Sequence, residues 1–262
     1  MALDSNATVF TGIAPLMYHS VAPLQDDPYQ LTVRPERLNQ QLRSLRRLGR
    51  TGTSVSNVLE ARQRGSRERL VGLTFDDGYA DFVENALPAL LRYGFTATLF
   101  VLAGRLGGSN EWDSEGSRKV LLTADQLREA ASAGIEIGSH GLQHVSLPSI
   151  SDAELSREIG ESRRILQEIT GQDINGFCYP YGHFDERVMK TVEAAGYDYA
   201  CAIADSPYAG RYAIRRTHMR DGDSPQQLWL KNTLRSLLAK YRPASSLSFR
   251  SLGRRAVAGS CP

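Results

Sequence analysis

Short apolar runs alternate with amphipathic segments along most of this chain, with few residues between them. The apolar runs predict strands at 13–19, 70–76, 97–103, 135–139, 176–180, 198–203 and 212–218. The helical periodicity predicts helices near 34–48, 79–93, 123–133, 151–170, 184–195 and 224–239. Because strands that alternate with helices pair in parallel, this order restricts the chain to an α/β fold built on a parallel sheet.

Three motifs place acidic, imidazole and aromatic side chains at the ends of predicted strands. They are Thr74-Phe75-Asp76-Asp77-Gly78, Ser139-His140-Gly141-Leu142-Gln143-His144 and Tyr179-Pro180-Tyr181-Gly182. The carboxyl ends of the strands meet at one face of a barrel, so the motifs are expected to form one site there. Each motif alone has an ordinary structural explanation, such as a turn, but their joint occurrence in this order favours a functional site.

The first two motifs have the residue types of a metal centre. Asp76 and Asp77 follow a buried run, and successive side chains leave a strand in different directions. One carboxylate can therefore bind a cation while the other stays free beside it. His140 and His144, four residues apart, can place two imidazoles on the same ion if the turn is helical. One aspartate and two histidines leave room for water, which predicts a metal-dependent hydrolase.

The motifs resemble those of the polysaccharide deacetylases of carbohydrate esterase family 4, the NodB-like domain, from residue 13 to about residue 230. This resemblance implies a distorted (β/α)7 TIM-like barrel of the α/β class. It also implies that Asp76 is the catalytic base and that Asp77, His140 and His144 bind the metal.

The third motif departs from the family pattern. The family usually has an arginine that orients the catalytic aspartate where this chain has Cys178, whereas Tyr181, whose backbone N–H would help to form the oxyanion hole, matches. A subgroup with the Tyr-Pro-Tyr-Gly variant supplies an arginine from a late strand. Arg216 is the first candidate for it and Arg215 the second, because neighbours on a strand face opposite ways. Two exposed arginines on a surface strand are the alternative.

The general acid also differs from the better-known family members, in which it is a histidine of a late Leu-x-His motif. No such motif is evident after residue 218. The segment that contains His19 resembles the opening Tyr-His strand of the same subgroup, so His19 is expected to be the proton donor. His218 is the second candidate, and a purely structural role remains open for either histidine.

Further residues are candidates for substrate binding. The loop after the third predicted strand opens at the same face, and its Trp112 could stack on a sugar ring while Asn110 or Asp113 bonds to the sugar hydroxyls. Tyr79, and Pro180 in the third motif, are further candidates. Trp112 could instead pin the loop, and Tyr79 could instead pack at the start of a helix.

The resemblance implies hydrolysis of the N-acetyl group of an amino sugar in a glycan or glycoconjugate, which releases acetate and a free amine. One divalent ion is expected as the cofactor, and two nitrogens and one oxygen suit zinc as well as cobalt, nickel or iron. The alternatives are a catalytically silent carbohydrate-binding barrel, an O-acetyl esterase, and an amidase that acts on non-sugar amides at the same site.

The chain has 262 residues and a net charge of +2, which allows one large domain and argues against a general nucleic-acid binder. We expect an N-terminal extension at 1–12, the deacetylase domain at 13–240 and a basic, disordered tail at 241–262. From Lys231 onward there are seven Lys or Arg residues and no acid. This tail could contact an anionic membrane surface or a glycan.

Localisation is predicted from features that the sequence lacks. No apolar run approaches the length of a transmembrane span, and the first six residues lack the basic and apolar regions of a signal peptide. The three cysteines show no metal-ligand spacing, which fits a reducing compartment. We therefore expect a cytoplasmic protein that acts on a cytoplasmic glycan intermediate.

Overall fold

The computed structural model describes residues 14–203 and 206–223. Its main sheet pairs strands in the order β10-β9-β8-β7-β6-β5-β1-β11, and each of these pairs is parallel. The last two strands in the chain, β10 (Ile214–Arg215) and β11 (Thr217–His218), lie at opposite ends of this order but are separated only by Arg216. Because β10 and β11 act as one interrupted strand, the sheet closes on itself almost completely, and the predicted α/β barrel with seven strand positions is confirmed.

The other strands of the main sheet are β1 (Leu16–Tyr18), β4 (Thr51–Thr53), β5 (Leu70–Phe75), β6 (Thr98–Val101), β7 (Glu136–Ser139), β8 (Gly176–Cys178) and β9 (Tyr199–Ala202). A separate parallel pair joins β2 (Ser20–Val21) to β3 (Thr32–Val33). The helices are α2 (Pro35–Arg47), α3 (Val55–Gln63), α4 (Leu87–Arg92), α5 (Ala124–Ser132), α6 (Asp152–Thr170) and α7 (Glu186–Ala194).

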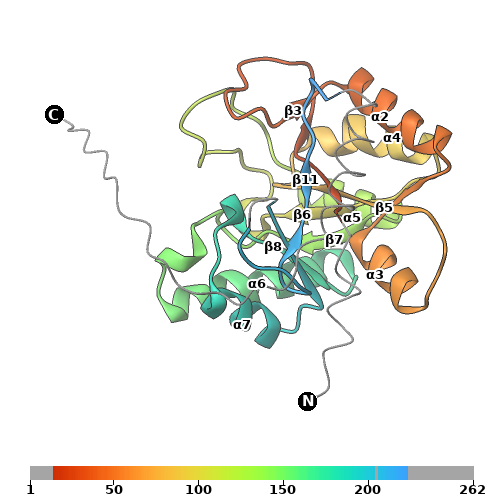
Figure 1. The fold of residues 1–262 in the computed structure, drawn as a ribbon. Coiled ribbons are helices and arrows are strands. Elements are labelled where there is room, and N and C mark those ends of the chain that lie inside the picture. The colour runs from red at the N-terminus through yellow and green to blue at the C-terminus, as the bar shows by residue number, and fades with distance from the viewer. Residues whose placement is uncertain (1–13, 204–205, 224–262) are drawn as a thin grey trace.

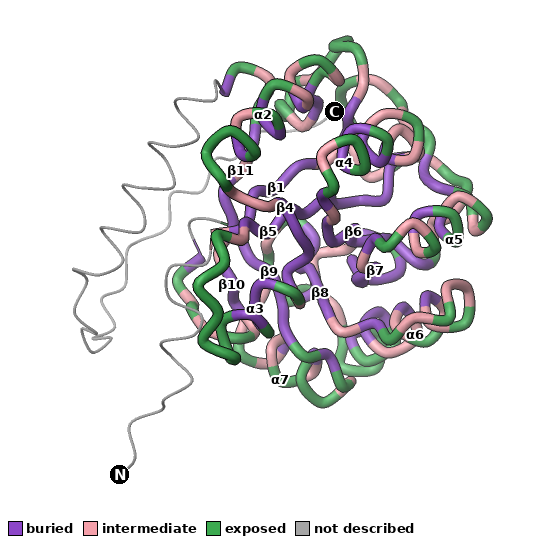
Figure 2. The backbone as a smooth tube through the Cα atoms, turned by 90° about the vertical axis from the view of Figure 1, so that its right-hand side faces the viewer, coloured by how far each residue is buried: buried purple, intermediate pink, exposed green. Residues whose placement is uncertain are grey.

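The strands form the centre of the molecule, and most helices surround them (Figure 1). The view along the barrel shows buried strands in a ring, with α2, α4, α5, α6 and α7 outside it (Figure 2). Local sequence sets where these helices begin. Both α5 and α6 begin at a capping box, formed by Thr123 with Gln126 and by Ser151 with Glu154, and α6 ends at Gly171 in the left-handed conformation.

The strand β4 and the helix α3 are absent from the sequence prediction. The β4 segment was missed because it has no apolar run. The helix α3 was missed because it does not cover the outside of the barrel as the other helices do. Instead, α3 packs inside one end of the barrel against a buried cluster on β6, β8, β9 and β10: Phe100, Cys178, Tyr199, Cys201 and Ile214. Its first N–H groups bond to the first residues of two strands, Val55 to Thr98 of β6 and Ser56 to Glu136 of β7. Since both contacts are at the amino ends of strands, α3 closes the end of the barrel opposite the three motifs.

Several predicted segments differ from the structure or lie beyond it. The helix predicted at 79–93 begins later, as the π-helical turn η1 (Phe82–Ala86) that continues into α4. The predicted extension at 1–12, the helix at 224–239 and the tail at 241–262 lie outside the described residues. In the part of the chain that the structure describes, no helix is long and apolar enough to cross a membrane.

Candidate active site

The backbone is strained where the three motifs meet. Among the described residues, four other than glycine have a positive φ: Gln30 at 55°, Asp77 at 70°, His144 at 59° and Tyr181 at 57°. Three of these four are predicted site residues, one from each motif. A left-handed conformation at such residues costs about 1–3 kcal/mol and persists only where the surroundings hold it. Contacts elsewhere in the fold must therefore offset the strain at these three residues and hold the motifs in place.

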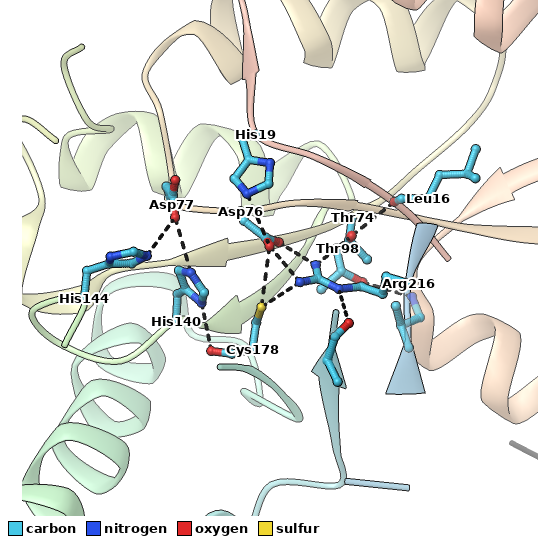
Figure 3. Close-up of polar contacts among 12 residues, drawn as sticks. Leu16, His19, Thr74, Asp76, Asp77, Thr98, His140, His144, Cys178 and Arg216 are labelled. Carbon is cyan, nitrogen blue, oxygen red and sulfur yellow. Dashed lines mark hydrogen bonds and ion pairs between the residues drawn. The ribbon is translucent and has the colours of Figure 1, made fainter. Parts of the chain in front are cut away.

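The predicted metal ligands lie together. Asp77 follows β5, and His140 directly follows β7. The Nε2 atoms of His140 and His144 lie 3.2 Å and 3.5 Å from Oδ1 of Asp77 (Figure 3). All three side chains are buried, with relative exposures of 3–7%. Their atoms are close enough to one another to hold a single cation.

The turn between the two histidines is not helical. The sequence analysis had required a helical turn for both imidazoles to reach one ion, and the structure corrects this requirement. Residues 140–146 form a loop. Buried Glu158 of α6 holds this loop by accepting the backbone N–H groups of Leu142 at 2.7 Å and Gln143 at 3.1 Å. The sequence analysis missed Glu158, because nothing in the helical pattern of α6 marks a residue that bonds to a distant loop.

The hydrogen bonds at these residues test whether a cation fits. Nδ1 of His140 donates to the backbone carbonyl of Cys178 at 2.8 Å, so the neutral imidazole has a lone pair on Nε2. This nitrogen faces Oδ1 of Asp77, a buried acceptor that has no hydrogen-bond partner among residues 14–203 and 206–223. Burial lowers the pKa of His144 to about 3, so its imidazole is neutral. Burial also opposes the charge on His140, but Cys178 and Asp77 outweigh it and raise the pKa of this imidazole, which shows that the site attracts a positive charge. One carboxylate and two imidazoles that converge in a buried place suit a divalent metal ion, which would supply the positive charge between them.

A second set of possible ligands does not suit a cation. Asp76, His140 and Cys178 are also close enough to share an ion. However, the Arg216 guanidinium donates to both carboxylate oxygens of Asp76, at 2.6 Å and 2.7 Å, and lies 3.0 Å from Sγ of Cys178. A metal ion there would be repelled by this buried positive charge, so the geometry favours the set around Asp77.

Arg216 is built into the barrel at the break between β10 and β11. Besides its two bonds to Asp76, it donates to Thr74 Oγ1 at 3.0 Å and to the Ala202 carbonyl at 3.3 Å, and it is 2% exposed. Burial raises the pKa of Asp76, but the charge and hydrogen bonds of Arg216 outweigh it and hold the pKa below its ordinary value. Arg215 faces away and donates to the Tyr208 carbonyl. The geometry therefore places the first candidate arginine, and not the second, at the carboxylate.

Cys178 lies where the family pattern has an arginine. Its thiol is buried and 3.5 Å from Oδ2 of Asp76, and burial raises its pKa to about 11. A neutral thiol of this kind is a poor nucleophile, so Cys178 serves here as a packing residue. The site thus has one guanidinium, from Arg216, in place of the arginine of the third motif.

Of the two candidate proton donors, His19 lies beside Asp76 and His218 lies against His19. Nε2 of His19 is 3.9 Å from Oδ2 of Asp76, and the His19 and His218 rings meet edge to face with centroids 5.6 Å apart. Burial, followed by the charge of His19, lowers the pKa of His218 to about 4. A histidine with so low a pKa holds a proton poorly near neutral pH, so the geometry and the pKa both favour His19.

The candidate substrate residues divide into two groups. Trp112 lies against His144, next to the oxyanion-hole candidate Tyr181, which contacts the same imidazole and is 45% exposed. Tyr79, Asn110 and Pro180 are buried, which argues against the predicted contact with a sugar. Burial and the neighbouring Asp77 raise the pKa of Tyr79, and the polar atoms of Asn110 bond within its own loop. For Tyr79 this corresponds to the packing alternative left open above.

The comparisons with known proteins agree with this geometry. A family model described as polysaccharide deacetylase matches residues 63–200, just over half of the chain. YxkH of Bacillus subtilis is 29% identical over 172 residues, which are 64% of this chain and 58% of that protein. A poly-beta-1,6-N-acetyl-D-glucosamine N-deacetylase of Staphylococcus aureus (strain N315) is 25% identical over 166 residues, 59% of this chain and 56% of that protein. The chain thus spans a little over half the length of these relatives.

Solved structures share the fold. The Streptococcus pyogenes deacetylase PplD in complex with acetate has a TM-score of 0.71 at 24% identity, over 83% of this chain and 96% of that one. IcaB from Ammonifex degensii has a TM-score of 0.70 at 21% identity, over 85% of this chain and 97% of that one. With a family match that contains the strand and turn of Asp76 and Asp77 and both histidines of the second motif, this chain belongs to the polysaccharide deacetylase family.

Proposed function

We propose that the protein is a metal-dependent deacetylase that removes the N-acetyl group of an amino sugar in a glycan or glycoconjugate. One observation carries the proposal: Asp77, His140 and His144 converge on one point beside a second carboxylate, Asp76, which Arg216 holds apart and ionised. A cation site and a separate base side by side are what amide hydrolysis by water requires. Membership of the family supports the same reaction.

Asp77, His140 and His144 would hold the metal ion. When bound, a divalent ion lowers the pKa of a water molecule and polarises an amide carbonyl. We propose zinc as the native ion, with cobalt, nickel and iron as ions that the same donor set accepts.

The residues around the metal site would move the protons. Ionised Asp76 would accept a proton from the attacking water, and Arg216 keeps it ionised in a buried place where a lone carboxyl would be protonated. His19, in contact with Asp76, would donate a proton to the departing amine. The backbone N–H of Tyr181, at a strained position of the third motif, would stabilise the oxyanion.

The substrate class follows from the relatives and from the aromatic side chains at the site. The Staphylococcus aureus relative is named for a β-1,6-linked N-acetylglucosamine polymer. Exposed aromatic rings such as Tyr181 suit the apolar faces of sugar rings. We therefore propose an N-acetylglucosamine-containing glycan or its precursor as the substrate.

The test is elemental analysis of the purified protein together with acetate release from short N-acetylglucosamine oligomers, with and without added zinc or cobalt. We expect one bound ion and acetate release that stops with a chelator and resumes with the ion. Asp77→Asn should lose both metal and turnover, whereas Asp125→Asn, at an exposed acid on α5, should keep both. Glycan binding without acetate release from any acetylated sugar would instead indicate a silent binding barrel.

A further inference from the structure

The two histidines that face Asp77 are held by different forces. The His140 ring is fixed by the hydrogen bond from its Nδ1 to the Cys178 carbonyl at 2.8 Å. Nδ1 of His144 is also buried, but it has no hydrogen-bond partner in the described part of the chain. A histidine that binds a metal through one nitrogen usually donates its other N–H to a carbonyl, a carboxylate or water, which sets the angle of the ring. Some other contact must set that angle in His144.

Aromatic rings supply this contact. The indole of Trp112 stacks on the His144 imidazole with centroids 4.6 Å apart and planes inclined by 30°. The Tyr181 ring meets the same imidazole edge to face, with centroids 4.3 Å apart and planes at 66°. An imidazole with one face covered by a stacked ring and an edge-on ring against it has little freedom to rotate. His144 is thus oriented by packing where His140 is oriented by a hydrogen bond.

The loop that carries Trp112 has anchors of its own. Within it, the Asn110 side chain donates to Asp113 at 3.0 Å and accepts from the Lys119 backbone N–H at 2.7 Å. Nζ of Lys119 then donates to Ser20 Oγ at 2.7 Å, which ties the loop to β2. Because these bonds fix the loop without the indole, Trp112 is not needed to pin it, and its position against His144 calls for a separate explanation.

We propose that Trp112 is a positioning residue that aims the His144 imidazole at the metal, an inference that rests on the metal centre proposed above. It acts through His144 and does not itself bind the ion. One face of the indole lies on the imidazole. Loss of the indole should therefore weaken metal binding even when no substrate is present.

The test measures the affinity of the whole chain for zinc by competition with a chromophoric chelator, in the absence of substrate. Trp112→Leu should weaken zinc binding about 10–100-fold, the usual effect of removing a group that orients a ligand. Trp112→Phe, which keeps a flat ring, should restore most of the affinity. Val120→Ala is the matched control, because it removes an apolar side chain of the same loop that is 62% exposed. It should bind zinc like the unmodified protein, and circular dichroism should show that all variants are folded.

A spectroscopic readout adds an independent check. The chain has two tryptophans, so in a Trp229→Phe background selective excitation of tryptophan reports on Trp112 alone. Binding of one cobalt ion should quench its fluorescence, because the indole stacks on a ligand of the ion. Three results would overturn this inference and leave the metal centre intact. They are an unchanged zinc affinity in Trp112→Leu, an equal loss of affinity in Trp112→Phe and Trp112→Leu, and a loss of affinity in Val120→Ala. If the unmodified protein bound neither zinc nor cobalt, the proposed metal centre would fail together with the inference.

Discussion

Asp76 and Asp77 are adjacent in the sequence, yet their carboxylates have different partners. Asp76 forms two hydrogen bonds with the guanidinium of Arg216, whereas Asp77 faces two imidazoles (Figure 3). The chain turns into a left-handed conformation at Asp77, which sends the second carboxylate away from the first. At the residue scale, the division between a base and a metal ligand thus comes from one strained backbone position.

Replacing each of these aspartates should separate the two roles. We expect Asp76→Asn to keep the bound ion and to lose turnover by a factor of about 100 or more, the usual contribution of a general base. Asp77→Asn, the matched variant one residue away, should lose the ion itself. Metal content by elemental analysis and acetate release measure the two effects. Full deacetylase activity in Asp76→Asn would show that another group is the base.

Arg216→Lys should change the pH dependence of the reaction. A lysine cannot reproduce the two parallel hydrogen bonds to Asp76, so the burial that raises the pKa of this carboxyl is less well opposed. The base must be ionised to work, and a higher pKa means that it becomes protonated at higher pH. The acidic limb of the kcat/KM profile should therefore move to higher pH, with a lower rate at neutral pH.

The control for this prediction is Arg215→Lys, because Arg215 points to the Tyr208 carbonyl instead. That variant should keep the profile of the unmodified enzyme. An unshifted acidic limb in Arg216→Lys would mean that Arg216 does not set the ionisation of the base.

At the scale of elements, two glycines should respond in opposite ways to the same substitution. A Cβ at Gly138 in β7 would come within 2.5 Å of the Phe100 ring inside the barrel, whereas a Cβ at Gly160 in α6 would meet nothing within 4 Å. Gly138→Ala should cost about 1–3 kcal/mol of unfolding free energy through overpacking. Gly160→Ala should add about 0.5–1 kcal/mol because alanine favours the helix. Denaturant unfolding measures the free energy of unfolding of both variants. If Gly138→Ala were as stable as the unmodified protein, the Phe100 ring could shift to make room for the added methyl group.

The arrangement of elements was predictable where a strand or helix has its own periodic pattern. The long helix α6 has a capping box at its start and a left-handed glycine at its end, so its limits follow from local sequence. The helix α3 packs its apolar residues inside the barrel, and β4, which precedes it, has only three residues. Such elements are stabilised by packing against the barrel, and the local sequence pattern does not predict that packing.

At the scale of the whole molecule, an ion pair joins segments far apart in the sequence. The side chain and backbone N–H of Arg34, just before α2, bond to the carboxylate of Asp221, near the end of the described chain. Burial opposes ionisation of Asp221, but the hydrogen bonds and the charge of Arg34 together outweigh it and lower the pKa of Asp221. A pKa lowered by folding stabilises the protein above the unfolded-state value, and this contribution disappears as the pH falls through the folded-state value.

Asp221→Asn should therefore lower the melting temperature slightly at neutral pH, because the Arg34 side chain is 48% exposed and solvent weakens the ion pair. The difference from the unmodified protein should shrink as the pH falls below about 4, the ordinary value for an aspartate, towards the lower folded-state pKa at which Asp221 becomes protonated. Thermal melts between pH 3 and pH 7 measure this. A difference that stays constant over this range would show that the ion pair contributes nothing and that the substitution acts through packing.

The sequence by itself determined the class of fold, the three motifs and the face of the barrel on which they meet, because strand ends, turn residues and ligand types are local properties of the chain. The tertiary structure decided which arginine reaches the base: Arg216 lies at the break between β10 and β11, and only closure of the barrel brings this break to Asp76. It also decided which histidine a hydrogen bond holds and which one aromatic packing holds. These contacts join residues that are distant in the sequence, so their energies depend on burial and angle, which residue spacing does not encode.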